Sequence, residues 1–188
     1  MSMFQKIIST LLITAGICLV IIGYMRIVDG QRQVDQSFQS AQAAIQQKGQ
    51  TDSPFVPKAG EIIGLLHIPK LNAELPIVEG TEAEDLAKGV GHYHESYLPN
   101  EQGQIVLSGH RDTVFRRTGE LVKGDQLVIE LSYGRFTYEI EKTKIVKKDD
   151  QSIITLQQEK EELILTTCYP FSFIGPAPNR YIIYGKRV

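Results

Sequence analysis

A charge-free, mostly apolar run close to the N-terminus sets the strongest limit on how this chain can fold. Ile7–Met25 reads IISTLLITAGICLVIIGYM, with Lys6 before it and Arg26 after it. A helix of this length rises about 28 Å, which is close to the ~30 Å hydrocarbon core of a bilayer. A cleaved secretory signal is the alternative, but the run is long for one and no small-x-small cleavage site follows it. We therefore expect a transmembrane anchor at 7–25, although the flanking charges barely decide its orientation.

The segment after the anchor divides into a helix and a linker. Gln31–Lys48 is rich in Gln and Ala, and its apolar residues recur near helical spacing, at Val34, Phe38, Ala41 and Ile45. Gly49–Gly60 contains two prolines and two glycines, which interrupt regular structure. We expect a juxtamembrane helix and linker over 26–60 and a folded domain over 61–188, with residues 1–6 as a short tail in front of the anchor.

From residue 61 onward most signals favour β-strands. Seven short segments are rich in β-branched or aromatic residues and are bounded by turn residues: 62–68, 75–79, 103–109, 125–131, 135–146, 161–168 and 180–186. TEAEDLAKG at 81–89 predicts a short helix that Thr81 caps together with Glu84. Together these elements predict an all-β domain with minor helix, arranged as a closed or nearly closed barrel. The net charge of −2, with mixed signs along the chain, gives no sign of a nucleic-acid-binding surface.

The chain has two cysteines, and they are not expected to pair. Cys18 falls inside the anchor, whereas Cys168 ends the apolar strand LILTT of the folded domain. If that domain faces an oxidising exterior, an unpaired thiol suggests an intermolecular bridge or a reactive group. A buried, inert side chain is the alternative. A free thiol is only a few per cent thiolate at neutral pH, so a reactive Cys168 needs a base or cation, and donors for the oxyanion formed on attack.

Two other residues occupy strand ends from which they could assist such a thiol. His110 directly follows QIVLSG, so the sheet holds it while the loop leaves it accessible. Arg180 begins the last strand after a loop rich in proline, and its guanidinium is always charged and offers five donors. Of the other histidines, His67 sits inside an apolar strand and is expected to be structural. His92 and His94 lie in the loop-like stretch GVGHYHESYLP.

Three motifs together resemble the sortases, the cysteine transpeptidases of Gram-positive bacterial surfaces. They are SGHRD at 108–112, LTTCYP at 165–170 and NRYIIYGK at 179–186. The family shows a histidine after a strand, a TLxTC strand and an arginine further along; Ile164 stands here where threonine is usual. The stretches GVGHYHESYLP and GQIVLSGHRDTVF also look like the family's approach to its histidine. A single N-terminal anchor without a C-terminal membrane segment is most similar to the class D group.

The resemblance implies an eight-stranded β-barrel outside the cell membrane, with the N-terminus in the cytoplasm. Cys168 would attack the threonine carbonyl of an LPxTG-like sorting signal at the C-terminus of a surface protein. A peptidoglycan-precursor amine would then release the acyl-enzyme. His110 would act as general acid and then as general base, and Arg180 would hold substrate and stabilise the oxyanion. No cofactor and no metal are expected, and no nucleic acid is expected as a partner.

Further site residues follow from the same resemblance. Thr167 would lend an additional donor to the substrate, and Asp112 would orient His110. Apolar residues of the segment 147–160 would contact the apolar part of the signal, namely Ile153, Ile154 and Leu156. Two alternatives stay open: a sortase-like peptidase that mainly hydrolyses its substrate, and a non-catalytic, membrane-anchored β-barrel binding module with an inert thiol.

Overall fold

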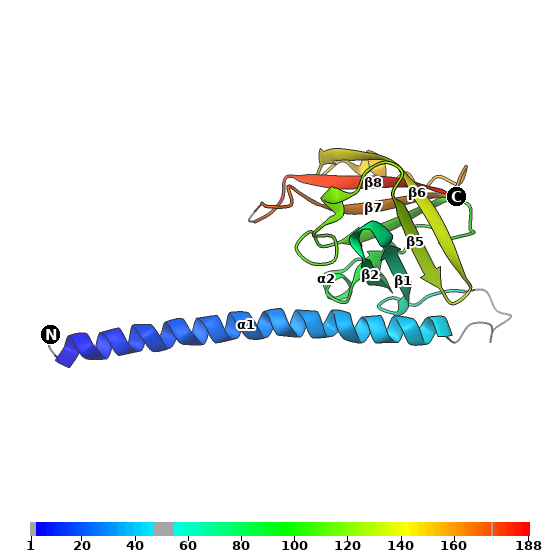
Figure 1. The fold of residues 1–188 in the computed structure, drawn as a ribbon. Helices are drawn as coiled ribbons and strands as arrows, with labels where there is room; N and C mark the ends of the chain where they lie inside the picture. Colours follow the sequence, from blue (N-terminus) through cyan, green and yellow to red (C-terminus); the bar gives the residue numbers. More distant parts are fainter. Residues whose placement is uncertain (1–2, 47–54, 174) are drawn as a thin grey trace.

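The computed structural model describes residues 3–46, 55–173 and 175–188 (Figure 1). A single long helix, α1 (Met3–Gln46), precedes a barrel and lies beneath it in this view. The expected linker at 49–60 falls partly outside the described residues, and residues 55–60 form no helix or strand. All residues predicted to be catalytic or to contact substrate therefore lie in the barrel and its loops.

Eight strands close into the barrel in the order β1-β2-β3-β4-β7-β8-β6-β5. They are β1 (Ile62–Ile68), β2 (Ala73–Glu79), β3 (Val90–His92), β4 (Gln104–Gly109), β5 (Gln126–Leu131), β6 (Gly134–Lys147), β7 (Glu162–Tyr169) and β8 (Asn179–Arg187). Neighbours are antiparallel except β2 with β3 and β4 with β7, which run parallel. The short helices are η1 (Pro69–Leu71), α2 (Ala83–Leu86), η2 (Thr118–Glu120) and η3 (Gln151–Ile153). The expected eight-stranded barrel with short helices is confirmed.

The structure corrects two local expectations. β3 lies in the stretch that the sequence favours as a loop, because a three-residue strand containing glycine shows no β-branched run. Gly91 is needed there, since a Cβ would collide with the carbonyl of Gly80. The helix expected at 81–89 shortens to α2, and its N-cap is Glu82, whose backbone amide donates to Asp85 Oδ2 at 3.3 Å. The expected cap at Thr81 is therefore wrong.

Apolar residues gather on both faces of the sheet. The barrel interior is filled mainly by Leu, Ile and Phe side chains, and every strand contributes to it, β3 through Val90 and β8 through Ile183. Tyr138 and Phe115 are among the largest fully buried side chains. A smaller cluster lies outside the barrel wall, where Ile153 of η3 covers Val106, Ile164 and Ile182 of β4, β7 and β8, together with Val146 and Tyr184. Full burial of one such side chain contributes roughly 1.5–3 kcal/mol. The outer cluster thus holds the segment after β6 against the barrel wall.

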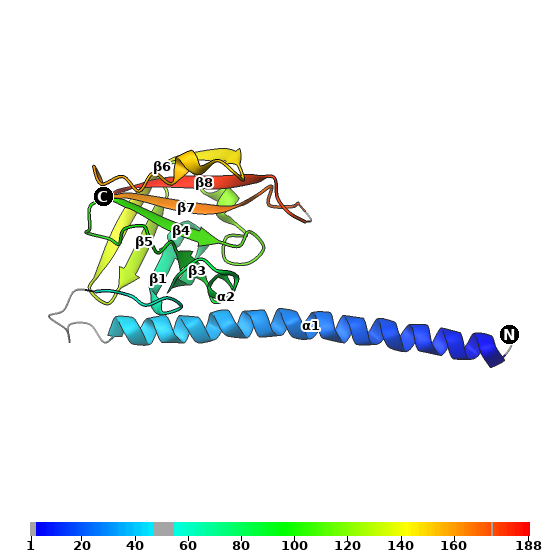
Figure 2. The same ribbon diagram turned by 180° about the vertical axis from the view of Figure 1, so that it is seen from behind.

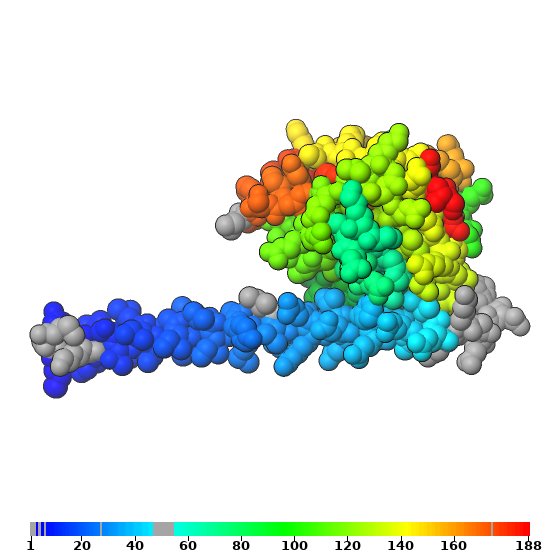
Figure 3. All heavy atoms as spheres, viewed as in Figure 1, coloured from blue at the N-terminus to red at the C-terminus, as the bar shows by residue number. Residues whose placement is uncertain are grey.

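α1 is uninterrupted, and its second half lies against the barrel (Figures 1 and 3). Its first part contains a stretch that is long and apolar enough to cross a membrane. Further along, Ser37 and Ala41 are buried, and Val34, Phe38 and Ile45 are partly covered, where α1 contacts β1 and β2. The juxtamembrane helix expected from the sequence is therefore a continuation of the same helix as the apolar run.

Replacing Ala41 by lysine should release the second half of α1 from the barrel. Ala41 has 0% exposed surface, so an ammonium placed there must enter the interface unpaired or push the helix away. A short helical segment without tertiary contacts is marginal in water. We expect amide hydrogen exchange over residues 33–46 to rise by roughly tenfold or more, equivalent to about 1.4 kcal/mol.

The measurement is hydrogen exchange with mass spectrometry on the full chain in detergent micelles. Ala43→Lys is the matched control, because Ala43 lies on the same helix and is exposed. Its exchange should equal that of the wild type. Equal exchange in the two lysine variants would contradict the docking of α1 on the barrel.

Candidate active site

Three of the predicted residues come together at one end of the barrel because β4, β7 and β8 are neighbours. Thr167 of β7 lies opposite Gly109 of β4 in the parallel pair, and His110 is the next residue after Gly109. Arg180 of β8 lies directly opposite Cys168 of β7. Cys168 is therefore flanked by His110 on one side and Arg180 on the other. His110 is exposed and the other two are half-buried, so the thiol is reachable from solvent.

The alternation of side chains along β7 puts the thiol on the outer face of the barrel. Successive side chains of a strand point to opposite faces. Leu163 and Leu165 belong to the barrel interior, whereas Ile164 belongs to the outer cluster. By the same alternation Cys168 shares the outer face with Ile164, and Thr167 shares the inner face. The site therefore lies outside the barrel wall, beside the outer apolar cluster.

Gly109 leaves room for side chains of the loop that begins with His110 to pack against the end of β4. A Cβ at this position would lie 2.6 Å from Phe115 Cδ2 and 2.8 Å from Val114 Cγ2, so only glycine lets these side chains lie this close. The backbone amide of Phe115 donates to the His110 carbonyl at 3.0 Å. The Thr167 hydroxyl donates to the Gly109 carbonyl at 2.7 Å and so ties the end of β4 to β7. The expected role of Thr167 toward substrate stays a prediction.

Arg111 connects the His110 loop with the loop that follows Cys168, and sequence reasoning did not single it out. Its side chain is buried, and its guanidinium donates to the carbonyls of Pro170 at 3.2 Å and Gly175 at 2.8 Å. Arg111 Nε also lies 3.5 Å from Asp112 Oδ1. The structure thus pairs Asp112 with Arg111, and an orienting role of Asp112 on His110 stays a prediction. The adjacent HRD motif was the only signal in the sequence for this connection.

A pocket of about 600 Å³ opens on the outer face and includes Arg180 in its lining. Its walls also contain the three apolar residues predicted to contact substrate, Ile153, Ile154 and Leu156. Ile153 is buried against the strands, whereas Ile154 is 40% exposed. Arg180 Nη1 donates to the Asn179 carbonyl at 3.1 Å, which steadies the guanidinium at the start of β8. The pocket therefore joins apolar residues to Arg180, and Glu95, Lys148 and Asp150 add further charges to its lining.

Gln104 holds the pocket-lining segment in place. Its buried side-chain oxygen accepts from the backbone amides of Thr155 at 2.9 Å and Leu156 at 3.2 Å. Its amide nitrogen donates to the Ile153 carbonyl at 3.2 Å. A buried amide with its donors and acceptor used in this way fixes the backbone of a segment that has only a short helix of its own. No pattern in the sequence pointed to this glutamine.

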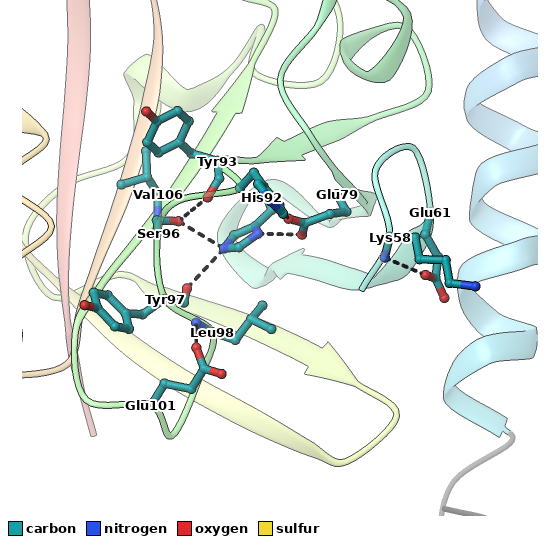
Figure 4. A network of polar contacts seen from close by, with 11 residues as sticks. Lys58, Glu61, Glu79, His92, Tyr93, Ser96, Tyr97, Leu98, Glu101 and Val106 are labelled. Atoms are coloured by element: carbon teal, nitrogen blue, oxygen red, sulfur yellow. Dashed lines mark hydrogen bonds and ion pairs between the residues drawn. The ribbon is translucent and has the colours of Figure 1, made fainter. Parts of the chain in front are cut away.

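His92 belongs to a buried polar network rather than to the Cys168 end of β7 (Figure 4). Its Nδ1 lies 2.7 Å from Glu79 Oε2, and its Nε2 lies 3.0 Å from Ser96 Oγ and 3.1 Å from the Tyr97 carbonyl. Both ring nitrogens are thus occupied by neighbours in the fold. Ser96 extends the network by donating to the Tyr93 carbonyl at 2.7 Å. The network secures the stretch that follows β3.

Glu79 carries a buried carboxylate shared by two histidines. His94 Nδ1 lies 2.9 Å from its second oxygen, and the Glu79 side chain is 2% exposed. Burial alone would raise the pKa of Glu79. The hydrogen bonds and charges of His92 and His94 outweigh burial, so the pKa of Glu79 lies below its ordinary value. The carboxylate therefore stabilises the fold in its ionised form.

The remaining residues that the sequence singles out lie away from Cys168. His67 Nε2 pairs with Glu130 at 2.9 Å, and its Nδ1 lies 3.4 Å from Glu74, which supports the structural role expected for His67 on β1. Cys18 is exposed on α1, and both cysteines are free. Within the described part of the chain, no group of three or more His, Cys, Asp or Glu side chains is arranged to hold a metal ion.

Comparison with known proteins gives a consistent family. A model of the Sortase domain matches residues 66–188. Sortase D of Bacillus subtilis (strain 168) is 60% identical over 98% of this chain and 99% of its own length. The fold is similar to a Clostridium perfringens Sortase D5 transpeptidase, with a TM-score of 0.65 and 26% identity over 71% of this chain and 82% of that one. The catalytic domain of B. anthracis SrtD matches with a TM-score of 0.60 and 43% identity, over 74% of this chain and 96% of that one.

Glu79→Gln should destabilise the protein more at neutral pH than at acidic pH. The substitution keeps the shape and removes the charge from hydrogen bonds worth about 1.5–3 kcal/mol each to a charged group. Because the folded-state pKa is lowered from 4.5, this stabilisation is complete above the unfolded value and is lost as pH falls through the folded pKa.

Denaturant unfolding of the full chain in detergent at pH 7 and at pH 4 measures the difference. We expect Glu79→Gln to lose about 1.5–3 kcal/mol at pH 7 and clearly less at pH 4. Glu84→Gln, at an exposed position of α2, is the matched control and should differ little from wild type at either pH. A loss that is the same at both pH values would show that the Glu79 charge is not what stabilises the network.

Proposed function

The chain belongs to the sortase family and its class D group, as a cysteine transpeptidase, and on this premise we propose how it acts. Cys168 cleaves an LPxTG-like sorting signal after its threonine and forms a thioester with the threonine carbonyl. A peptidoglycan-precursor amine then takes over the acyl group. The observation that carries this proposal is the pairing of Cys168 with Arg180 across β7 and β8, with His110 at the end of the neighbouring strand β4.

Each step assigns a proton and a charge to one of these residues. The Cys168 thiol gives its proton to His110 as its sulfur attacks the carbonyl carbon, and the carbonyl oxygen becomes an oxyanion. Arg180 donates to that oxygen, because a guanidinium next to the thiol can stabilise the negative charge that develops there. His110 protonates the leaving nitrogen as the carbon–nitrogen bond breaks. It then accepts a proton from the incoming amine, which displaces the sulfur.

The outer pocket supports a peptide substrate that lies along the barrel wall. Ile153, Ile154 and Leu156 offer apolar contacts for the first residues of the signal, and Arg180 lies in the same lining. A peptide extended along this wall would bring its threonine to the Cys168 end of β7. In this proposal Thr167 lends an additional donor to the substrate and Asp112 orients His110. Their side-chain contacts in the structure are with the Gly109 carbonyl and with Arg111.

The apolar part of α1 anchors the enzyme as a single-pass membrane protein. In this proposal the N-terminus lies in the cytoplasm and the barrel outside, where surface proteins and the peptidoglycan precursor are found. Support comes from the exposed apolar side chains of α1, which the barrel leaves uncovered. Cys18 then lies in lipid, and Cys168 works as an unpaired thiol.

An enzyme that mainly hydrolyses the thioester is the second candidate. The exposure of His110 favours it, because water can reach the same proton acceptor that an amine would use. A non-catalytic binding module, in contrast, does not agree with family membership of a cysteine transpeptidase. Hydrolysis and transfer differ only in the nucleophile, so the two are separated by adding an amine.

Cys168→Ala should abolish cleavage of a sorting peptide while the barrel stays folded. The substitution removes one sulfur at a half-buried position, which costs little compared with a deep core truncation. The assay is cleavage of five-residue sorting peptides, with and without an amine, and circular dichroism of the same samples. Cys18→Ser is the matched control and should cleave like wild type. Turnover by well-folded Cys168→Ala would rule out the thioester, and products without amine adduct would favour the hydrolase.

Arg180→Lys and His110→Ala should affect different parts of the reaction. Lysine keeps the charge but lacks the planar fork of donors, and loss of an oxyanion donor costs about 10²–10³ in kcat. His110→Ala should cost about 10²–10⁴ and remove the limb of the pH–rate profile that reports the imidazole. Arg135→Lys, at an exposed position near the start of β6, is the control. Wild-type turnover in Arg180→Lys, or an unchanged profile in His110→Ala, would contradict the assigned role.

A further inference from the structure

The catalytic end of the barrel points toward the apolar half of α1. The loop between β7 and β8 projects along α1 in the direction of the N-terminus, and the two opposite views in Figures 1 and 2 agree on this. The carboxyl end of β4 points the same way (Figure 2). His110 and Cys168 lie at these two strand ends. If α1 crosses a membrane, this end of the barrel therefore faces the membrane surface.

The length of α1 between its apolar run and its docking site brings that end close to lipid. From Met25 to Val34, which is partly covered where α1 lies against the barrel, a helix rises only about 14 Å. A compact domain of this size has a radius of gyration of about 14 Å. The polar headgroup layer adds roughly 5–7 Å to each side of the hydrocarbon core. The near edge of the barrel thus reaches the level of the headgroups.

The tip of the β7–β8 loop has the chemistry of a membrane interface. Phe173 is 43% exposed, and the neighbouring Gly175 and Pro176 are exposed as well. Arg116 is exposed on the adjoining loop after β4. Phenylalanine is among the apolar residues that interfacial segments bury at the boundary between headgroups and acyl chains, and basic residues near the surface are attracted by anionic lipids. Contact with lipid would explain why Phe173 is exposed at this end of the barrel.

The loop is also held in the position from which it would touch lipid. Arg111 fixes both of its arms through the carbonyls of Pro170 and Gly175, and its guanidinium lies 5.9 Å from the centre of the Phe173 ring. The first arm is fixed further by Phe171, whose ring packs against Tyr181 of β8 at 5.3 Å between centroids. These contacts hold the loop in place and leave part of the Phe173 side chain exposed.

We propose that Phe173 rests in the headgroup layer of the membrane that α1 crosses, so that the Cys168 end of the barrel opens onto the lipid surface. This inference rests on the anchor described under the proposed function, but not on the catalytic roles. Phe173 acts as a second, shallow contact with the membrane. Together with α1 it fixes the tilt of the barrel, which a single helix would leave less constrained.

The chain contains no tryptophan, so a single substitution introduces a clean fluorescent reporter. Phe173→Trp is made in the full chain and reconstituted into vesicles of phosphatidylcholine and phosphatidylglycerol, with or without bromine on the upper acyl chains. Tyr24→Trp, in the apolar run, reports the anchor. Val188→Trp, at the opposite end of the barrel (Figure 1), reports a position away from lipid. Ser172→Trp, also exposed, is a second reporter in the loop.

We expect brominated lipid to quench Phe173→Trp and Ser172→Trp, with blue-shifted emission, and to leave Val188→Trp unchanged. Quenching of Tyr24→Trp without quenching of either loop reporter would overturn the inference and leave the anchor standing. An unquenched Tyr24→Trp would remove the anchor and the inference together. Quenching of Val188→Trp to the same extent as Phe173→Trp would also overturn it, because contact would then not be specific to this end. Peptide cleavage by the same samples tests the catalytic proposal separately.

Discussion

The parallel pairing of β4 with β7 is the constraint on which the site depends. Parallel neighbours leave the sheet at the same edge, so His110 and Cys168, which are far apart in the sequence, emerge side by side. β5 and β6 form the long connection that parallel pairing requires, and they close the barrel on its other side. β8 then returns antiparallel to β7, which places its first residues, Arg180 among them, at the same edge.

The inner face of the barrel wall carries core residues, and the outer face carries the candidate site. Leu163 and Leu165 fill the interior, while Cys168 lies on the outer face, so changes at the thiol leave the core untouched. The outer apolar cluster, in contrast, positions the segment that lines the pocket. By covering Ile164 and Ile182, Ile153 holds the segment after β6 against the wall and creates the pocket beside Arg180. The same apolar contact that stabilises this segment therefore also shapes the surface offered to a peptide.

Sequence reasoning reached the strands and the strand-end residues but not the contacts between loops. Strands such as β1 show in the sequence because β-branched residues and turn residues mark them, and the ends of seven predicted strands agree with the structure within two residues. β3 was missed because its strand character comes from its neighbours, not from its own residues. Arg111, Gln104 and the carboxylate of Glu79 were missed for the same reason. Their partners are backbone groups or histidines that only the tertiary register brings near.

The continuity of α1 has a consequence for how the enzyme meets its substrates. In an unbroken helix, each additional residue rotates everything that follows by about 100° around the helix axis and moves it about 1.5 Å along that axis. One residue inserted between the apolar run and Val34 would therefore swing the barrel about a quarter of a turn around the helix axis. In the membrane-anchored state proposed above, the number of residues in this stretch would set which side of the barrel meets the bilayer. Under the same proposal, a substrate protein diffusing in that membrane would meet a site at one fixed height and one fixed orientation.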